Sequence, residues 1–234
     1  MQGNIVPKHI GIIMDGNRRF SKKLMLKPWN GHEWGAKKVE KLFNWCQEFD
    51  IKELTLYTFS IQNFNRPKKE FDYLMKIFKE NFDKLIDDER LDSNGIRINI
   101  IGRIKMFPKD VQERLNKIME KTKNNNNYII NFAMAYGGRE EIIDATKKIA
   151  EQIKNKTLNV EDIDEKIFSS NLYCADQPDL IIRTGGDRRT SNFLSFQSAY
   201  SEWLFIDKMW PEFEKKDFED AIKDFSERQR RFGK

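Results

Sequence analysis

The sequence predicts an α/β fold, in which a central, mostly parallel six-stranded sheet is flanked by helices. Short runs rich in apolar and β-branched residues alternate along the chain with longer segments whose apolar residues recur at helical spacing. Strands that alternate with helices are typical of parallel sheets that are covered on both faces. The predicted strands are His9–Met14, Glu53–Phe59, Ile96–Ile101, Tyr128–Met134, Asp179–Arg183 and Glu202–Ile206.

Amphipathic helices are expected between these strands. In Glu33–Phe49 the apolar side chains share one face, and Pro67 opens a second helix at a position where proline is well tolerated. Aromatic and aliphatic residues then repeat at helical spacing from Phe71 to Ile86. Further helices are predicted at Pro108–Lys121, Arg139–Lys154, Val160–Ser169 and Lys216–Arg231.

The composition is that of a globular protein. Hydrophobic residues make up 39%, charged residues 34% and aromatic residues 12% of the 234 residues, which excludes a disordered chain. The chain has no internal repeat and no long linker, so residues 1–234 are expected to form a single domain. A net charge of +5 favours anionic partners, which include phosphorylated small molecules, nucleic acid and acidic membrane surfaces.

The cysteines and the apolar segments indicate a cytoplasmic protein. Cys46 and Cys174 belong to no metal-binding pattern and indicate reduced thiols. No segment approaches the roughly 20 apolar residues that span a bilayer. The first residues contain no signal-peptide core. If membranes matter to this protein, we expect it to reach them from the aqueous side.

Polar residues and glycines follow the predicted strands. Asp15–Arg19 follows the first strand, Ser60–Pro67 the second, Tyr136–Arg139 the fourth and Thr184–Asn192 the fifth. In open α/β sheets ligands bind beyond the carboxyl ends of the strands. Arginine side chains fit phosphate oxygens, and glycine turns add backbone donors. Asp15 among these arginines fits Mg²⁺, which is commonly held by one or two carboxylates together with substrate phosphates. The sequence therefore predicts a diphosphate site.

Each of these features also has a purely structural interpretation. Asp15 could cap the following helix, and His9 and His32 are expected to be structural when each is taken alone. The stripe from Phe71 to Ile86 also fits a plain core. The coincidence of several polar loops at one sheet edge favours a functional site over these alternatives.

Several other classes of protein fit the sequence less well. The acidic run Asp87–Asp92 stands alone, whereas trans-prenyltransferases need two such motifs on an all-helical fold, so it indicates a solvated helix end. The absence of GxxxxGK[ST] and GxGxxG patterns argues against P-loop and classical dinucleotide enzymes. A nucleic-acid-binding module would need a basic stripe with interleaved aromatics, whereas these arginines lie in separate loops.

Five segments occur in an order that is specific to one family. They are His9–Arg19, Gly31–Ala36, Leu54–Pro67, Ala135–Arg139 and Asp179–Phe193. The segments Ala199–Glu202 and Arg230–Gly233 also match. Together they make nearly the whole chain similar to the cis-prenyltransferases, the undecaprenyl diphosphate synthase family.

The resemblance implies repeated addition of isopentenyl diphosphate to an allylic diphosphate such as farnesyl diphosphate, with Mg²⁺ assisting departure of the allylic diphosphate. The product would be a long polyprenyl diphosphate, which in bacteria is typically the undecaprenyl carrier for cell-wall peptidoglycan precursors. A non-catalytic subunit of the same fold is the alternative, but such subunits tend to lose the Asp15 loop or the Arg189–Ser191 motif, and both are intact here.

The resemblance also implies partners. It predicts a homodimer formed through the C-terminal half, with which Trp203, Phe205 and Trp210 are consistent. Peripheral contact with lipid at the inner face of the membrane is a further expectation. No nucleic-acid partner is expected.

The family's site residues carry over onto matching positions. Asp15 matches the aspartate that positions Mg²⁺, and Asn63 matches a residue proposed to take part in proton removal, so both are predicted to be catalytic. Glu202 matches a second, metal-linked carboxylate. The positions that match substrate contacts are Gly16, Asn17, Arg18, Arg19, Phe20, Lys27, His32, Ser60, Phe64, Arg66, Arg183, Arg189, Thr190 and Ser191.

Two arginines depart from the family pattern. The family often has glycine where Arg18 stands, and the additional arginine is expected to strengthen phosphate binding. Some members have a metal-linked histidine where Arg188 stands. Because arginine cannot ligate a metal, that contact is not expected here.

The growing product needs an apolar channel. A hydrophobic tunnel is therefore expected between the sheet and its helices, with walls from Val39–Phe49 and Phe71–Ile86. Ile130 and Phe132 are expected at its floor. A helix of about 20 residues is ~30 Å long, which is enough to enclose an extended polyprenyl chain.

Overall fold

The computed structural model describes residues 6–27 and 29–228. Within these ranges the sheet has six strands in the order β3-β4-β2-β1-β5-β6, and every pair of neighbours is parallel. The strands are β1 (His9–Ile13), β2 (Glu53–Ser60), β3 (Ile96–Ile101), β4 (Tyr128–Tyr136), β5 (Leu180–Arg183) and β6 (Glu202–Phe205). The predicted α/β fold is confirmed, and the sheet is entirely parallel in the described ranges.

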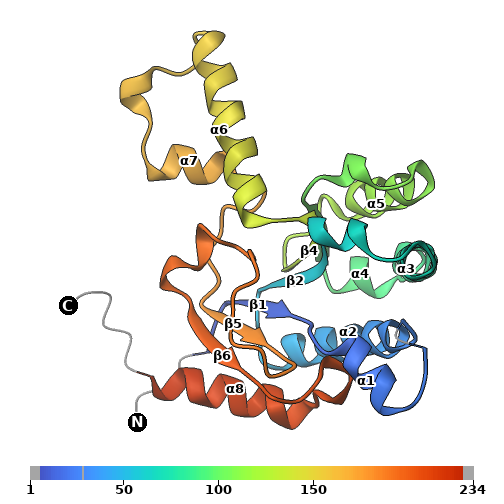
Figure 1. Ribbon diagram of the computed structural model, residues 1–234. Helices are drawn as coiled ribbons and strands as arrows, with labels where there is room; N and C mark the ends of the chain where they lie inside the picture. The colour runs from blue at the N-terminus through green and yellow to red at the C-terminus, as the bar shows by residue number, and fades with distance from the viewer. Residues whose placement is uncertain (1–5, 28, 229–234) are drawn as a thin grey trace.

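Helices surround this sheet and project from it (Figure 1). They are α1 (Asn17–Lys23), α2 (Gly31–Glu48), α3 (Lys68–Ile86), α4 (Arg90–Ser93), α5 (Lys109–Thr122), α6 (Gly138–Lys154), α7 (Glu165–Asn171) and α8 (Lys215–Glu227). Short 3₁₀ turns, which include η1 (Ile61–Asn65) and η3 (Val160–Asp162), lie in the connections between these elements. No helix in the described ranges is both long and apolar enough to cross a bilayer.

The short helices α1 and α4 are not among the predicted ranges, and two of the predicted helices differ from the structure. The segment predicted as one helix from Val160 to Ser169 is divided, because Asp164 is extended and its side chain caps α7 by accepting a 2.7 Å hydrogen bond from the Ile167 N–H. The predicted helix to Arg231 begins at Lys215 and ends at Glu227. Residues 229–231 of that prediction lie outside the described residues.

The core is divided by the sheet into two parts. Alternate residues of a strand point to opposite faces, so Ile12 belongs to a large core that includes side chains of α2, α3, α5 and α8, while Ile13 belongs to a second core that includes Phe193. Trp210, expected at a dimer interface, lies inside the first core, where its ring is fully buried and its Nε1–H donates to the Gly35 carbonyl at 2.9 Å. Trp210 is therefore a core residue, which corrects that expectation.

A buried polar network crosses the second face of the sheet. Asn131 Nδ2 donates to Glu53 Oε1 at 2.6 Å and to Thr55 Oγ1 at 3.0 Å, and His9 Nε2 lies 2.8 Å from the same hydroxyl. Burial lowers the pKa of His9 to about 4, so this histidine is neutral and structural at physiological pH. Burial also raises the pKa of Glu53 to about 7.

The substitution Glu53→Gln tests this network through the pH dependence of stability. A carboxyl whose pKa is raised on folding stabilises the protein fully below its unfolded pKa, and that contribution is lost as the pH rises through about 7. We expect Glu53→Gln to stabilise the protein by about 2 kcal/mol more at pH 8.5 than at pH 5. Urea unfolding at both pH values measures this. A difference no larger than that of Glu219→Gln, on the surface of α8, would contradict it.

Candidate active site

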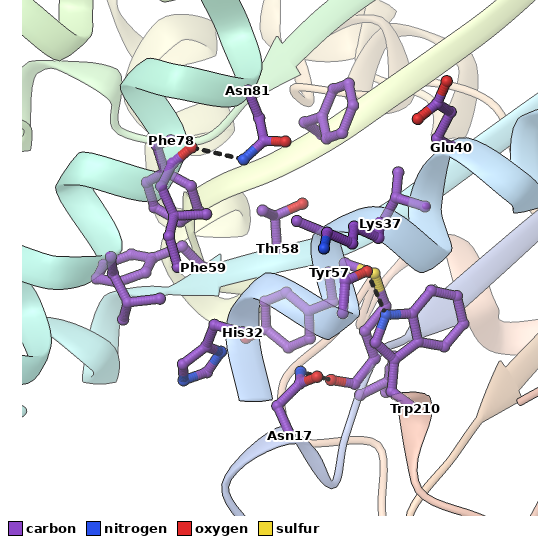
Figure 2. A pocket seen from close by; sticks show the side chains of 18 of the residues that line it. Asn17, His32, Lys37, Glu40, Tyr57, Thr58, Phe59, Phe78, Asn81 and Trp210 are labelled. Atoms are coloured by element: carbon purple, nitrogen blue, oxygen red, sulfur yellow. Dashed lines mark hydrogen bonds between the residues drawn. The ribbon is translucent and has the colours of Figure 1, made fainter. Parts of the chain in front are cut away.

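A cavity of about 820 Å³ opens at the carboxyl edge of the sheet and continues between α2 and α3. In Figure 2, Asn17 and His32 lie at one end of the view and Glu40 and Asn81 at the other. Most of the predicted site residues line this cavity, and they come from four separate segments of the chain. They are Asp15, Gly16, Asn17, Arg18, Arg19, His32, Ser60, Asn63, Arg66, Arg183, Arg189 and Ser191.

Asp15 lies at the centre of the polar end of the cavity. Arg183 Nη2 donates to Asp15 Oδ2 at 2.8 Å, and Arg19 Nη2 lies 3.3 Å from Oδ1. Burial opposes ionisation of Asp15, but the hydrogen bond and charge of Arg183, with the charge of Arg19, outweigh it and hold the pKa below its ordinary value. Asp15 is therefore a carboxylate at neutral pH.

The alternative that Asp15 is merely a helix cap does not hold. The N-cap of α1 is Gly16, which has a φ of 105° and no side-chain capping hydrogen bond. A Cβ at Gly16 would lie 2.8 Å from Met209 Cβ, so only glycine fits this turn. The turn leaves the Asp15 side chain in the cavity wall, available to a ligand.

Arg183 joins the Asp15 loop to the loop that follows β5. Its side chain is only 3% exposed, and Nη1 donates to Ser191 Oγ at 2.6 Å and to the Arg189 carbonyl. Gly185 is required in this loop because it has a φ of 89° and lies against the Asp15 backbone. Arg183 thus fixes the relative positions of Asp15 and Ser191.

A second cluster of charge surrounds the buried carboxylate of Glu70. Arg66 Nη1 donates to Glu70 Oε1 at 2.7 Å, and both His32 Nε2 and Arg18 Nε lie 3.7 Å from the same oxygen. Burial and then the charge of Arg66 lower the pKa of His32 to about 4. His32 is therefore neutral, and its Nε2 accepts a 3.2 Å hydrogen bond from Arg66.

Asn63 and Ser60 form the turn between β2 and η1. The Asn63 Oδ1 accepts a 3.1 Å hydrogen bond from the Ser60 N–H, in a reciprocal capping arrangement. Both side chains line the cavity. Asn63 is thereby held in one orientation, with its amide group at the polar end.

Five predicted site residues do not line the cavity: Phe20, Lys27, Phe64, Thr190 and Glu202. Phe20 packs against Trp34 with ring centroids 5.8 Å apart, Lys27 lies over Trp29, and Phe64 packs on Phe59. Thr190 is exposed.

Glu202 is placed at the opposite edge of the sheet from Asp15. It begins β6, where it is in register with Leu180 at the start of β5, and its carboxylate lies 2.8 Å from Arg228 Nη1. Asp15 instead follows the end of β1. Within one chain a metal ion at Asp15 is therefore not shared with Glu202.

The predicted site omitted two carboxylates that organise its arginines. Asp187 Oδ2 accepts a 2.8 Å hydrogen bond from Arg189 Nη2 and lies 3.5 Å from Arg19 Nη2. Glu70 lies in the first turn of α3, whereas Arg66 is extended and precedes that helix, so their ion pair does not follow from helical spacing. Nothing local distinguishes Glu70 or Asp187 from ordinary surface carboxylates in the sequence.

The inner part of the cavity is mostly apolar. Its walls include Val39 and Phe43 from α2 and Leu74, Phe78 and Phe82 from α3, as predicted. Phe132 also lines it, as the sequence predicted, but Ile130 does not. At the far end the lining becomes polar again, and Arg90 Nη2 lies 3.0 Å from Glu40 Oε1.

The polar end of the cavity suits a magnesium ion whose coordination shell is completed by the phosphates of a bound substrate. In residues 6–27 and 29–228 no group of three or more histidine, cysteine, aspartate or glutamate side chains could hold a metal alone. Mg²⁺ is commonly bound by one or two carboxylates together with substrate phosphates. Both Asp15 and Asp187 line the cavity, and Arg183 lies between them. Arg183 Nη2 is 2.8 Å from Asp15 Oδ2 and 3.8 Å from Asp187 Oδ2. These residues fit such an ion.

Comparison with known proteins decides the family. The family model described as undecaprenyl diphosphate synthase matches residues 13–233. The chain belongs to this family of cis-prenyltransferases. It is 47% identical to the tritrans,polycis-undecaprenyl-diphosphate synthase (geranylgeranyl-diphosphate specific) of Pyrococcus horikoshii, with 100% of this chain and 89% of that protein aligned. The enzyme of the same name from Methanocaldococcus jannaschii is 47% identical over 98% of this chain and 83% of its own.

Solved structures of cis-prenyltransferases share the fold. Lavandulyl diphosphate synthase from Lavandula x intermedia, in complex with dimethylallyl diphosphate, has a TM-score of 0.93 and 33% identity, covering 98% of this chain and 99% of that one. A probable undecaprenyl diphosphate synthase from Campylobacter jejuni has a TM-score of 0.82 and 33% identity, covering 99% and 100%.

The substitution Glu70→Gln tests whether the buried carboxylate holds the arginine cluster together. Loss of its charge leaves Arg66 and Arg18 facing each other across a buried position, so we expect a loss of about 2 kcal/mol in the free energy of unfolding. The matched control is Glu80→Gln, which removes an exposed pair with Lys76 on the same helix and should cost less than about 0.5 kcal/mol. Equal losses in urea unfolding would contradict this role for Glu70.

Proposed function

We propose that this cis-prenyltransferase extends an allylic diphosphate by repeated addition of isopentenyl diphosphate and so makes a long polyprenyl diphosphate. One observation supports this most strongly: a single cavity has arginines and a carboxylate at its mouth and aromatic and aliphatic walls behind them. A prenyl diphosphate needs both environments: its diphosphate group suits the charged mouth, and its isoprenoid chain suits the apolar walls behind the mouth. In this proposal the inner part of the cavity would serve as the predicted hydrophobic tunnel and would hold the growing chain.

Geranylgeranyl diphosphate is the proposed allylic starter. The relatives from Pyrococcus horikoshii and Methanocaldococcus jannaschii are named as specific for it, and both are about half identical to this chain over almost all of its length. Farnesyl diphosphate, the starter expected from the sequence, is the alternative. The role of the product as a carrier for peptidoglycan precursors remains a prediction.

The diphosphate groups would lie against two arginine sets. The allylic diphosphate would contact Asn17, Arg18 and Arg19 beside Asp15, and isopentenyl diphosphate would contact Arg189 and Ser191. When bound at Asp15, Mg²⁺ would supply charge that stabilises the departing diphosphate. Preorganised arginines stabilise the same developing charge, because they need no reorganisation as the carbon–oxygen bond breaks.

Asp15, His32 and Asn63 are each poorly suited to act as a general base. Asp15 is a weak base because its pKa is lowered, and His32 is neutral with its Nε2 already accepting from Arg66. Asn63 is an amide, so it would orient the isopentenyl group rather than take its proton. We infer that C1 of the allylic chain bonds to C4 of isopentenyl diphosphate as the allylic diphosphate leaves, and that this diphosphate accepts the proton lost from C2.

The proposed assembly is a homodimer in the cytoplasm. β6 is an edge strand of the sheet, and Trp203 and Phe205 stack on it with ring planes 14° apart while remaining partly exposed. A partner that covers this edge would bury both rings and protect the unpaired strand.

The substitution Asp15→Ala tests the proposed chemistry. Because the carboxylate supports departure of the diphosphate, we expect kcat to fall by about 10³-fold with a much smaller change in KM for isopentenyl diphosphate. Incorporation of labelled isopentenyl diphosphate, with and without Mg²⁺, measures this. Asp87→Asn, in the exposed acidic run after α3, is the control and should retain activity. Full activity of Asp15→Ala would overturn the proposed role.

The choice of starter is tested by competition. We expect kcat/KM to be about tenfold or more higher with geranylgeranyl diphosphate than with farnesyl diphosphate, which corresponds to one additional isoprene unit buried in the apolar part of the cavity. Chromatography of products from mixtures of the two starters measures the ratio directly. A ratio below one would favour farnesyl diphosphate.

A further inference from the structure

An apolar tip projects from the turn between α1 and α2. It consists of Leu24, Met25 and Leu26, whose side chains are 44%, 95% and 42% exposed. In Figure 1, α1 and this turn lie at the margin of the molecule, far from the projecting α6 and α7. Contiguous exposed apolar residues mark contact sites for membranes or proteins more often than isolated ones do.

The backbone conformation that exposes Met25 is unfavourable for a methionine. The Leu26 N–H donates to the Ser21 carbonyl at 2.9 Å and the Met25 N–H donates to the Lys22 carbonyl at 3.0 Å, which is the Schellman arrangement that ends many helices. Met25 occupies the left-handed position of this arrangement with a φ of 55°. Glycine adopts that conformation without steric cost, whereas methionine does not. Met25 gains almost no burial within the chain in return.

Trp34 extends the apolar tip along the surface. Its side chain is 52% exposed and packs edge-on against Phe20, with ring centroids 5.8 Å apart. Phe20 lies four residues before Leu24, so both point from the same side of α1. A half-exposed tryptophan beside exposed aliphatic residues is typical of surfaces that enter the headgroup region of a bilayer.

Lysines flank the tip on both sides in sequence. Lys22 and Lys27 have no carboxylate within 4 Å among the described residues, and Lys27 Nζ lies 5.8 Å from the Trp29 ring. Lys23 is paired with Glu212 at 2.7 Å. An apolar surface flanked by lysines is complementary to an anionic lipid surface, because the acyl chains bury the apolar residues while the headgroups neutralise the lysines.

We propose that the apolar tip inserts into the headgroup region of an anionic lipid bilayer. Lys22 lines the cavity, and Arg18 and Arg19, one turn earlier on α1, line it too. Insertion of the tip therefore places the mouth of the cavity beside the membrane. The consequence that a polyprenyl product passes directly into lipid rests on the proposed function, whereas the binding itself does not.

The experiment is co-sedimentation of the full chain with vesicles, without substrates. Vesicles of phosphatidylglycerol and phosphatidylcholine in equal amounts are compared with vesicles of phosphatidylcholine alone. We expect binding to the anionic vesicles that weakens with salt, and a loss of about tenfold in partitioning for Met25→Gly, because one buried side chain is removed. Met25→Gly should also keep or raise the melting temperature, since glycine suits the left-handed position.

Two further proteins make the outcome decisive. Val160→Ser removes an apolar side chain that is 60% exposed in η3, away from the tip, and should bind like the parent. Leu24→Ser combined with Leu26→Ser should lose binding as Met25→Gly does. Equal binding by the parent and the tip variants, or no preference for anionic vesicles, would overturn the proposal. Self-association that depends on Met25 in sedimentation velocity would assign the tip to a second copy of the chain instead.

Discussion

The site depends on the hydrogen bond between the buried guanidinium of Arg183 and the carboxylate of Asp15. β1 and β5 are parallel neighbours, so the residues that follow them meet at one edge of the sheet. Arg183 is almost fully buried and would be unstable there without its partners, which are Asp15, the Arg189 carbonyl and the Ser191 hydroxyl. The same contacts that satisfy its charge bring two loops, far apart in the sequence, into one binding surface.

This arrangement explains how one cavity combines charge with an apolar interior. Arg183 fixes the first pair of loops, and Glu70 fixes Arg66, Arg18 and His32 across the mouth from them. The buried carboxylate keeps like charges together in the absence of a ligand, and a diphosphate would supply further negative charge. Behind the mouth, apolar side chains of α2 and α3 line the cavity, and a prenyl chain bound against them would lower the dielectric constant around the charges at the mouth.

Much of this could be predicted from the sequence, because it follows from local patterns and parallel topology. The alternation of strands and helices alone predicts that Asp15, Ser60 and Arg183 lie at one edge of the sheet. What could not be predicted depends on long-range packing. Glu202 matches a family motif, but it lies at the start of β6 and therefore at the edge of the sheet opposite to Asp15. Trp210 is fully buried in the core rather than exposed for a partner. The role of Asp187 depends on two arginines that approach it only in the folded chain.

The most direct test of the central claim is a crystal structure with Mg²⁺ and geranylgeranyl thiolodiphosphate, an analogue whose carbon–sulfur bond resists cleavage. We predict that its diphosphate lies between Asp15 and Arg19 and that its chain lies between Val39 and Phe78. A diphosphate bound away from Asp15, or a chain lying outside the space between α2 and α3, would contradict the proposed site.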